Sequence, residues 1–342
     1  MRTDSSTPDA RPATSPGTMR AVVQDTYGEA DVLRLAEIDR PAITDDEVLV
    51  RVHAAGVDQG AWHLMAGLPY PVRLAGYGVR APKTPVRGRE FAGRVEAVGA
   101  AVTTMRAGDE VFGVAEGAFA EYAPAAAAKL APKPATLSFQ QAAALPISGL
   151  TALQAVRDQG QVKAGDRVLV IGASGGVGTF AVQIAKAFGA EVTGVCSTAK
   201  VDLVRSLGAD HVVDYSLGDD LGAGQRRYDV IVDTGGNRPL RVLRRALTPT
   251  GTLVIVGAET GGRWLGGTDR QLRAMVLSPF VGQRLRSFVS SENAADLVVL
   301  SELVESGALT PVVDRVFPLA ETAAAVRYLR AGGARGKVVV EV

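Results

Sequence analysis

Two patterns of apolar and polar positions divide the chain. From Met19 onward, short runs rich in β-branched residues are separated by turns of Gly, Pro and Asp. These runs predict short strands over residues 20–23, 48–52, 93–98 and 110–113. Regularly spaced short strands of this kind indicate a small barrel-like β domain.

After about Ala142 the pattern changes to alternating helices and strands. A helix is expected over Phe139–Ala155, ahead of a buried strand at Arg167–Ile171. Further strands are expected at Glu191–Val195, His211–Val213, Asp229–Val232, Thr252–Val256 and Arg286–Val289. Such alternation predicts an open, doubly wound parallel sheet with helices on both faces, and an α/β fold overall.

The C-terminal tail returns to mixed elements. We expect a helix at Ala294–Glu305, a strand at Val312–Val316, a helix at Glu321–Arg330 and a strand at Lys337–Glu341. We assign residues 19–141 and 308–342 to the β domain, and residues 142–307 to the parallel-sheet domain. Residues 1–18 are polar and are expected to form a disordered leader. The two domains would enclose a cleft at the carboxyl edge of the parallel sheet, where such sheets bind ligands.

A glycine-rich turn follows the first strand of the predicted parallel sheet. It reads Gly172-Ala-Ser-Gly-Gly-Val-Gly178 and leads into a helix. The glycines permit a tight turn and close approach of a ligand, and the helix start offers free N–H groups to a pyrophosphate. A glycine turn without a ligand is the alternative, but the strand-turn-helix context favours a dinucleotide site. A P-loop is excluded, because no Lys-Ser or Lys-Thr pair closes the turn.

The end of the next strand indicates which dinucleotide binds. NAD-binding units carry an acid there for the ribose hydroxyl. This chain has Ser197, Thr198 and Lys200 instead, and these residues suit the 2′-phosphate of NADPH. Under the alternative interpretation, Lys200 simply begins a solvated helix.

Composition narrows the class of protein. The chain has 342 residues and a net charge of +1, which gives no electrostatic footprint for nucleic acid or an anionic membrane. No apolar run is long enough to span a bilayer. A single cysteine, Cys196, excludes intramolecular disulfides and fits a reducing cytosol, so we expect a cytoplasmic protein.

One segment fits neither pattern. Residues 62–85 carry Tyr70 and Tyr77 and several aliphatic residues among prolines and glycines. Long irregular segments are usually either functional or disordered. The aromatic content of this one favours an ordered loop over a substrate.

The chain resembles the medium-chain dehydrogenase/reductase family in its zinc-independent quinone oxidoreductase branch. The resemblance covers Met19–Val342. It rests on Gly93-Arg-Val-Glu-Ala-Val-Gly99, Gly108-Asp-Glu-Val-Phe-Gly113, Gly149-Leu-Thr-Ala152, Gly172-Ala-Ser-Gly-Gly-Val-Gly178 and Arg335-Gly-Lys-Val338. It implies a GroES-like β-barrel catalytic domain beside a Rossmann domain.

The resemblance also implies the cofactor-binding residues. Lys200 and Tyr215, fifteen residues apart, have the spacing of the pair that flanks the 2′-phosphate in relatives. Thr151 corresponds to a residue near the nicotinamide, and the ends of two further strands touch the cofactor. The full expected set is Thr151, Ser174, Gly175, Gly176, Val177, Gly178, Ser197, Thr198, Lys200, Tyr215, Thr234, Gly235, Gly257 and Arg335.

Zinc members of the family carry a Cys in the first loop and a Gly-His-Glu after it. This chain has Asp58 and Gly88-Arg89-Glu90 at those places, so no set of zinc ligands is expected. His53 and His63 lack partners at ligand spacing, which favours structural roles. Relatives often have Asn where Asp58 stands, so the catalytic detail at this position is open. The Tyr-x-x-x-Lys pair of short-chain reductases is also absent.

The remaining chemistry is hydride transfer from NADPH to a quinone or an α,β-unsaturated carbonyl. Asp58, His63, Tyr70 and Tyr77 are the candidates for donating to or orienting the acceptor. Two alternatives stay open: an enoyl reductase of a biosynthetic pathway, and a non-catalytic NADPH-binding sensor or partner module.

A homodimer is expected through the cofactor domain. The strand predicted at Arg286–Val289 ends the doubly wound unit, and an unpaired apolar edge invites pairing with a second copy. The alternative is a monomer with a covered edge.

Overall fold

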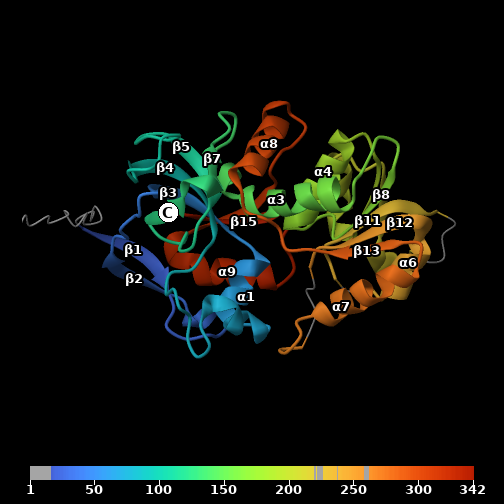
Figure 1. Ribbon diagram of the computed structural model, residues 1–342, viewed down its shortest axis with the longest axis horizontal. Helices are drawn as coiled ribbons and strands as arrows, with labels where there is room; N and C mark the ends of the chain where they lie inside the picture. Colours follow the sequence, from blue (N-terminus) through green and yellow to red (C-terminus); the bar gives the residue numbers. More distant parts are fainter. Residues whose placement is uncertain (1–16, 219–220, 222–225, 237, 258–261) are drawn as a thin grey trace, which may run out of the picture.

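The computed structural model describes residues 17–218, 221, 226–236, 238–257 and 262–342. They form a mainly antiparallel sheet and a parallel sheet, with helices packed around both (Figure 1). The expected α/β fold with two domains is confirmed. Of the expected leader, residues 1–16 lie outside the described residues. The boundary at residue 18 is wrong, because Thr18 already pairs with Asp39 in a hairpin.

The first sheet contains strands from both ends of the chain. Its order is β14-β15-β3-β4-β5-β7, with β6 also paired to β3, and β1 and β2 form a separate hairpin. The strands are β1 Thr18–Val23, β2 Arg34–Asp39, β3 Glu47–Val57, β4 Glu90–Val98, β5 Glu110–Val114, β6 Tyr122–Ala126, β7 Leu130–Pro132, β14 Val313–Pro318 and β15 Lys337–Glu341. In β3, Val50 and Val52 are buried and Arg51 is exposed between them, the alternation of a strand with one face on a core.

The second sheet is parallel throughout. Its order is β10-β9-β8-β11-β12-β13. The strands are β8 Arg167–Ile171, β9 Glu191–Cys196, β10 His211–Asp214, β11 Tyr228–Asp233, β12 Leu247–Ile255 and β13 Arg284–Ser287. Val168, Leu169 and Val170 are all fully buried, because helices cover both faces of the central strand.

The helices correct two expectations. They are α1 Gln59–Ala66, α2 Phe139–Ala143, α3 Pro146–Gln154, α4 Gly176–Ala187, α5 Val201–Ser206, α6 Leu240–Ala246, α7 Thr268–Leu277, α8 Ala294–Glu305 and α9 Thr322–Arg330. The single helix predicted over Phe139–Ala155 is wrong: Pro146 begins a second helix, because proline has no N–H to continue the first. The irregular segment also begins later than expected, since α1 occupies its first residues.

The last strand of the parallel sheet is displaced from its expected position. β13 ends at Ser287, so Phe288 and Val289 follow the strand instead of belonging to it. Phe288 packs against the central core, which α3 and α4 form with the parallel sheet, whereas Val289 is 95% exposed. β13 pairs only with β12 among the described strands and therefore is an edge of the sheet, as expected.

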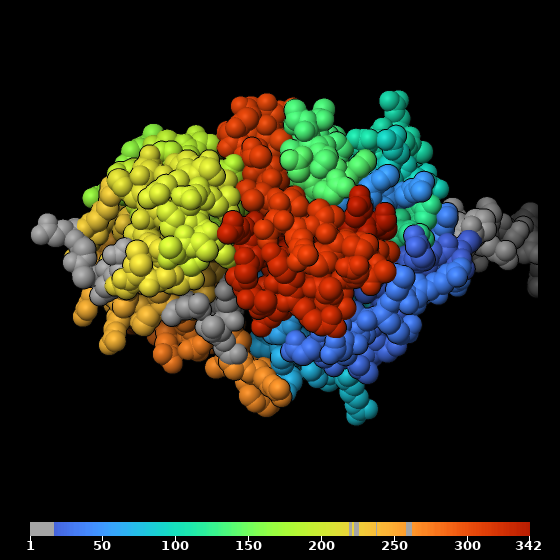
Figure 2. All heavy atoms as spheres, turned by 180° about the vertical axis from the view of Figure 1, so that it is seen from behind, coloured from blue at the N-terminus to red at the C-terminus, as the bar shows by residue number. Residues whose placement is uncertain are grey.

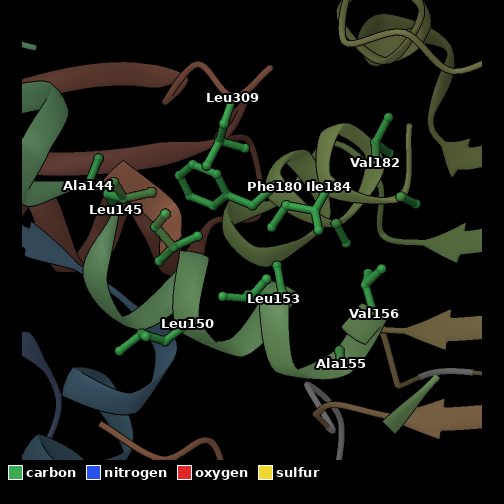
Figure 3. Packing of buried hydrophobic residues seen from close by; sticks show 14 of the residues in the cluster. Ala144, Leu145, Leu150, Leu153, Ala155, Val156, Phe180, Val182, Ile184 and Leu309 are labelled. Atoms are coloured by element: carbon green, nitrogen blue, oxygen red, sulfur yellow. The ribbon is translucent and has the colours of Figure 1, made fainter. Parts of the chain in front are cut away.

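The largest core lies where α3 and α4 meet above the parallel sheet. Phe180 and Ile184 of α4 face Leu153 of α3, and Leu309 packs on Phe180 from the chain that returns to the first domain (Figure 3). All four side chains are 1% exposed or less. Burial of each contributes roughly 1.5–3 kcal/mol, and Leu309 joins the chain that returns to the first domain to this core.

The C-terminal segment links the two domains. β15 pairs antiparallel with β3, and Gly336 just before it forms a parallel bridge with Gly175 of the glycine turn. From behind, the C-terminal residues, in red, lie between the two lobes of the molecule (Figure 2). The first sheet is thereby completed directly beside the turn of the second.

Candidate functional site

The glycine turn between β8 and α4 can only be built with glycine. Gly172 has a φ of +78°, and a Cβ on Gly178 would overlap the carbonyl oxygen of Gly172. Gly175 is the N-cap residue of α4 and provides no side chain, so the first N–H groups of the helix are not capped by it. These features form a cradle for an anionic group at a helix start, which is what a dinucleotide pyrophosphate requires.

The ends of neighbouring strands meet at this turn. The hydroxyl of Thr234, after β11, donates to the carbonyl of Ile171 at 2.7 Å. A Cβ on Gly172 would lie 3.3 Å from the amide nitrogen of Gly235, and one on Gly257 would lie 3.8 Å from the carbonyl of Thr234. The structure therefore brings these expected cofactor residues together at the carboxyl edge of the sheet.

The residues expected at the 2′-phosphate lie on two short turns in contact with each other, Thr198–Lys200 and Tyr215–Leu217. The ammonium of Lys200 donates to the carbonyls of Gly332 and Ala334, at 3.2 and 2.7 Å. The ring of Tyr215 is 55% exposed. Lys200 thus connects the strand end to the C-terminal segment, a role that the sequence did not indicate.

Asp214 is a carboxylate in this region that sequence reasoning missed. It ends β10 and accepts a hydrogen bond from the backbone of Ser216 at 2.9 Å. A hydrogen bond from Thr198, together with that from Ser216, holds the pKa of Asp214 below its usual range. Asp214 therefore holds the side chain of Thr198 at this end of the sheet. The signal was present in the sequence, at the end of the third strand of the sheet.

The remaining expected cofactor residues lie on both sides of the turn. The hydroxyl of Thr151, on α3, donates to Ile147 at 2.7 Å and lies 3.1 Å from the hydroxyl of Ser290. Ser174 accepts the N–H of Gly336 through its carbonyl at 2.9 Å. Arg335, next to that bond, is exposed. Gly176 and Val177 form the first turn of α4.

A buried ion pair supports the start of α4. The ammonium of Lys337 donates to the carboxylate of Glu90 and, at 3.1 Å, to the hydroxyl of Ser148. The second oxygen of Glu90 accepts the N–H of Ile147 at 2.9 Å. A Cβ on Gly176 would lie 3.1 Å from Cδ of Lys337, so the pair packs directly against the helix start.

Burial dominates the ionisation of Glu90. It raises the pKa of Glu90 to about 7, against the opposing charge of Lys337, and the charge of Asp58 adds to the rise. Glu90 is fully buried and Lys337 is 2% exposed. Both residues lie in motifs that the sequence displayed, Gly88-Arg-Glu90 and Arg335-Gly-Lys337, but neither motif indicated that they would meet.

The four expected catalytic residues lie at three different places. Asp58 is the N-cap of α1 and accepts the N–H of Ala61 at 2.8 Å, while its other oxygen is buried without a hydrogen bond. On the same helix, Nδ1 of His63 lies 2.8 Å from the carbonyl of Leu68. Burial lowers the pKa of His63, and the charge of Asp58 partly opposes this effect.

The two tyrosines have other surroundings. Tyr70 meets Trp264 of the second domain edge to face, with ring centroids 5.1 Å apart, and its N–H donates to Arg263 at 2.9 Å. Tyr77 instead lines a cavity of about 290 Å³ in the first domain, and its carbonyl accepts the hydroxyl of Tyr27 at 2.8 Å. The irregular segment therefore both contacts the second domain and borders a cavity.

The site does not fit zinc. Asp58 caps a helix, Glu90 is paired with Lys337, and Arg89 forms an ion pair with Glu292. Zinc needs thiolate, imidazole or carboxylate ligands in a tetrahedral set. In the described part of the chain, no group of three or more His, Cys, Asp or Glu residues is arranged to hold a metal ion. His53 stacks on Phe139 at 4.2 Å between ring centroids, a packing role.

Fold and site together define a two-domain protein with a dinucleotide cradle at the carboxyl edge of its parallel sheet. The alcohol dehydrogenase GroES-like domain family matches residues 44–135, and the zinc-binding dehydrogenase family matches residues 207–340. The mouse (Mus musculus) NAD(P)H oxidoreductase RTN4IP1 is 34% identical over 95% of this chain and 89% of its own length.

Two further comparisons agree. The chloroplastic NADPH-dependent alkenal/one oxidoreductase of Arabidopsis thaliana is 34% identical over 96% of this chain and 81% of its own. The quinone oxidoreductase structure from Coxiella burnetii superposes with a TM-score of 0.81, at 30% identity over 95% of this chain and all of that one. The chain belongs to the medium-chain dehydrogenase/reductase family, in its quinone oxidoreductase branch. The resemblance read from the sequence is confirmed, and the protein is a nicotinamide-dependent oxidoreductase.

Proposed function

We propose that the protein reduces a quinone or an α,β-unsaturated carbonyl with NADPH and without zinc. The glycine cradle carries this proposal, because its tight backbone excludes any Cβ at Gly178 and sets the start of α4 at the carboxyl edge of the sheet, where a helix N-terminus can hold a pyrophosphate. The lack of a fitting zinc ligand set around Asp58 and Glu90 supports the metal-free part. Without a Lewis acid, alcohol oxidation of the zinc type has no means of lowering the pKa of the alcohol.

The residues of the chain would divide the binding of NADPH among them. The turn 172–178 and the start of α4 would hold the pyrophosphate, and Thr234, Gly235 and Gly257 would line the edge beside it. Ser197, Thr198 and the exposed ring of Tyr215 would face the 2′-phosphate, with Lys200 fixed nearby by Gly332 and Ala334. The bound cofactor supplies a hydride, which is the chemistry that the protein itself lacks.

The acceptor then needs donors near the oxygen on which negative charge develops. Tyr77 lines the cavity of the first domain, and His63 lies on the helix that forms one of its walls. His63 is held by Leu68, and its lowered pKa favours the neutral ring. A neutral imidazole has one N–H, and at Nδ1 it already donates to the carbonyl of Leu68, so Nε2 has no proton to donate to the acceptor. Tyr77 is therefore the better candidate for a donor.

Measurement of NADPH consumption with a panel of quinones, enones and enoyl thioesters tests this proposal. Turnover of quinones or enones is expected. Turnover of enoyl thioesters alone would support the enoyl reductase, and NADPH binding without turnover of any acceptor would support the non-catalytic module.

The dimer also remains part of this proposal. β13 is an edge of the parallel sheet, and exposed apolar side chains lie nearby on α7 and the turn after it: Met275, Val276 and Phe280 are 60%, 70% and 81% exposed. Apolar side chains beside an open edge favour a second copy of this chain as the partner. We infer a two-fold contact that extends the sheet across both copies.

No helix among the described residues is long and apolar enough to cross a membrane. A cytoplasmic location stays part of the proposal, as does the lack of nucleic-acid partners. The reducing chemistry and the single buried cysteine, Cys196, support the first point. The mouse relative is a mitochondrial protein by name, and the Arabidopsis relative a chloroplastic one.

A further inference from the structure

The cavity in the first domain is unusually cationic for a site that takes a neutral quinone or enone. It holds about 290 Å³, close to the lower limit for small-molecule pockets. Ala61, Leu64 and Tyr77 provide its apolar wall. Lys83, Arg87, Arg89 and Glu116 provide its charges, three positive and one negative.

Arg87 is the unusual member of this set. It is only 7% exposed, and the Nε of its guanidinium is buried without a hydrogen-bond partner. Among the described residues its side chain forms no ion pair or hydrogen bond. Burial lowers the pKa of Arg87, and the charges of Glu116 and Tyr27 oppose that effect. A buried guanidinium without a partner is costly, so this side chain is poised to gain from an anion.

The neighbouring cations are already engaged or exposed. Arg89 forms an ion pair with Glu292, and the carboxylate of Glu292 also accepts a hydrogen bond from the ammonium of Lys129 at 2.9 Å. Lys83 is exposed to solvent. Glu116 is exposed as well and accepts the hydroxyl of Thr84 at 3.1 Å. Arg87 is therefore the cation of this cavity that is both buried and unpaired.

The backbone holds Arg87 in place. Its N–H donates to Val22 at 3.2 Å, and its carbonyl accepts the N–H of Phe119 at 2.8 Å. Val22 and Phe119 are both 3% exposed or less. Because both neighbours belong to the core, the guanidinium is presented from a rigid base, which is how a specific anion site is built.

We propose that Arg87 binds a carboxylate carried by the acceptor, so that the preferred substrates are enones or quinones that bear a carboxylate group. The proposal rests on the reductase function proposed above. A guanidinium offers a planar fork of N–H donors that matches a carboxylate in bidentate fashion. The aromatic and aliphatic wall formed by Tyr77, Leu64 and Ala61 would contact the carbon skeleton of such an acceptor.

The experiment compares matched acceptors. Benzalacetone is the neutral enone, and its ring-carboxylated forms carry the acid at the ortho, meta or para position, which varies the reach from the enone. For the wild-type protein, kcat/KM is expected to be at least about tenfold higher for one of the acids than for benzalacetone. This ratio is equivalent to about 1.4 kcal/mol. Arg87→Leu should remove that preference, so that the ratio of kcat/KM for this acid to kcat/KM for benzalacetone falls to about one.

Two controls keep the result interpretable. Arg106→Leu removes an arginine whose side chain is 89% exposed and lies outside the cavity, and it should leave the preference intact. Arg87→Lys keeps the charge without the fork and should retain only part of the preference. The unfolding temperature of Arg87→Leu should be no lower than that of the wild type, because the substitution removes an unpaired buried charge.

A second measurement does not depend on turnover. Benzoate alone should raise the unfolding temperature of the wild type and have no such effect on Arg87→Leu. Reduction of benzalacetone and all three acids at equal kcat/KM, without benzoate binding, would overturn the inference and leave the reductase function standing. If no acceptor is reduced while benzoate still binds through Arg87, the reductase function fails and the anion site stands. An Arg87→Leu protein that unfolds would assign Arg87 a structural role and overturn the inference.

Discussion

The backbone N–H of Gly336 donates to the carbonyl of Ser174 at 2.9 Å, and this bond joins the last strand of the first sheet to the glycine turn of the second. One residue further on, Lys337 reaches Glu90 and Ser148. The cofactor cradle is thus attached to the domain that would bind the acceptor. Rigid attachment of this kind keeps donor and acceptor in a fixed relation.

Gly178→Ala should abolish cofactor binding. The added Cβ would overlap the carbonyl of Gly172, so the turn must open and the helix start must shift. We expect at least about a hundredfold loss of NADPH affinity, or about 2.7 kcal/mol, by fluorescence titration. Gly333→Ala is the matched control, since no atom lies within 4 Å of the site of its Cβ. Unchanged NADPH affinity in Gly178→Ala would contradict the cradle.

The Glu90–Lys337 pair should make stability depend on pH. Burial raises the pKa of Glu90 from 4.5 to about 7 in the folded state. Between these values the folded state holds a proton that the unfolded chain has released, so Glu90 contributes stability that is lost as pH rises. The loss amounts to roughly 3 kcal/mol from below about pH 4.5 to above about pH 7.

A double variant isolates this effect. Glu90→Gln combined with Lys337→Met should remove the pH-dependent loss, whereas Lys337→Met alone leaves a buried carboxylate and should cost about 3–5 kcal/mol at neutral pH. Urea unfolding of the wild type and both variants across this pH range provides the free energies. If the free energies of unfolding of the wild type and the double variant change with pH in the same way, the raised pKa of Glu90 is refuted.

NADPH should bind at least about tenfold more tightly than NADH, or about 1.4 kcal/mol. Lys200→Ala should lose most of this preference and leave NADH binding nearly unchanged. Because Lys200 also holds Gly332 and Ala334, this variant should melt at a slightly lower temperature than the wild type. Ser197→Ala, which leaves those two bonds in place, should weaken the binding of NADPH without lowering the melting temperature. Equal affinities for the two cofactors in the wild type would defeat the prediction.

The dimer should separate when charge is placed beside the β13 edge. Phe280→Asp changes a side chain that is 81% exposed and should give the mass of a monomer by light scattering, with NADPH binding retained. A charge at Phe288 is a poorer test, because that side chain packs against the central core. A wild type that is monomeric at micromolar concentration would rule out the dimer.

Some of this structure could be predicted from the sequence because it depends on local signals. The run Val168–Ile171 followed by the glycines specified strand, turn and helix within one short stretch. Pro146, which separates α2 from α3, was a visible signal for a helix start. The apolar periodicity on both sides of it nevertheless favoured one continuous helix. The position of β13 was wrong by two residues, since short edge strands carry a weak pattern.

What the sequence could not show was contact between distant residues. Lys337 and Glu90 are separated by most of the chain, and the pairings of β15 with β3 and of β3 with β4 bring them together. Asp58 was a reasonable catalytic candidate by position, but capping of α1 occupies one of its oxygens. The placement of Arg87 likewise depends on its backbone hydrogen bonds to the distant residues Val22 and Phe119.

The most direct test of the account measures NADPH oxidation by protein whose metal content is known. The protein is stripped with a chelator, its zinc is quantified by elemental analysis, and turnover is followed with quinone and enone acceptors. We predict undiminished turnover at far less than one zinc per chain. Turnover that disappears with the chelator and returns with zinc, or no NADPH oxidation with any acceptor, would contradict the account.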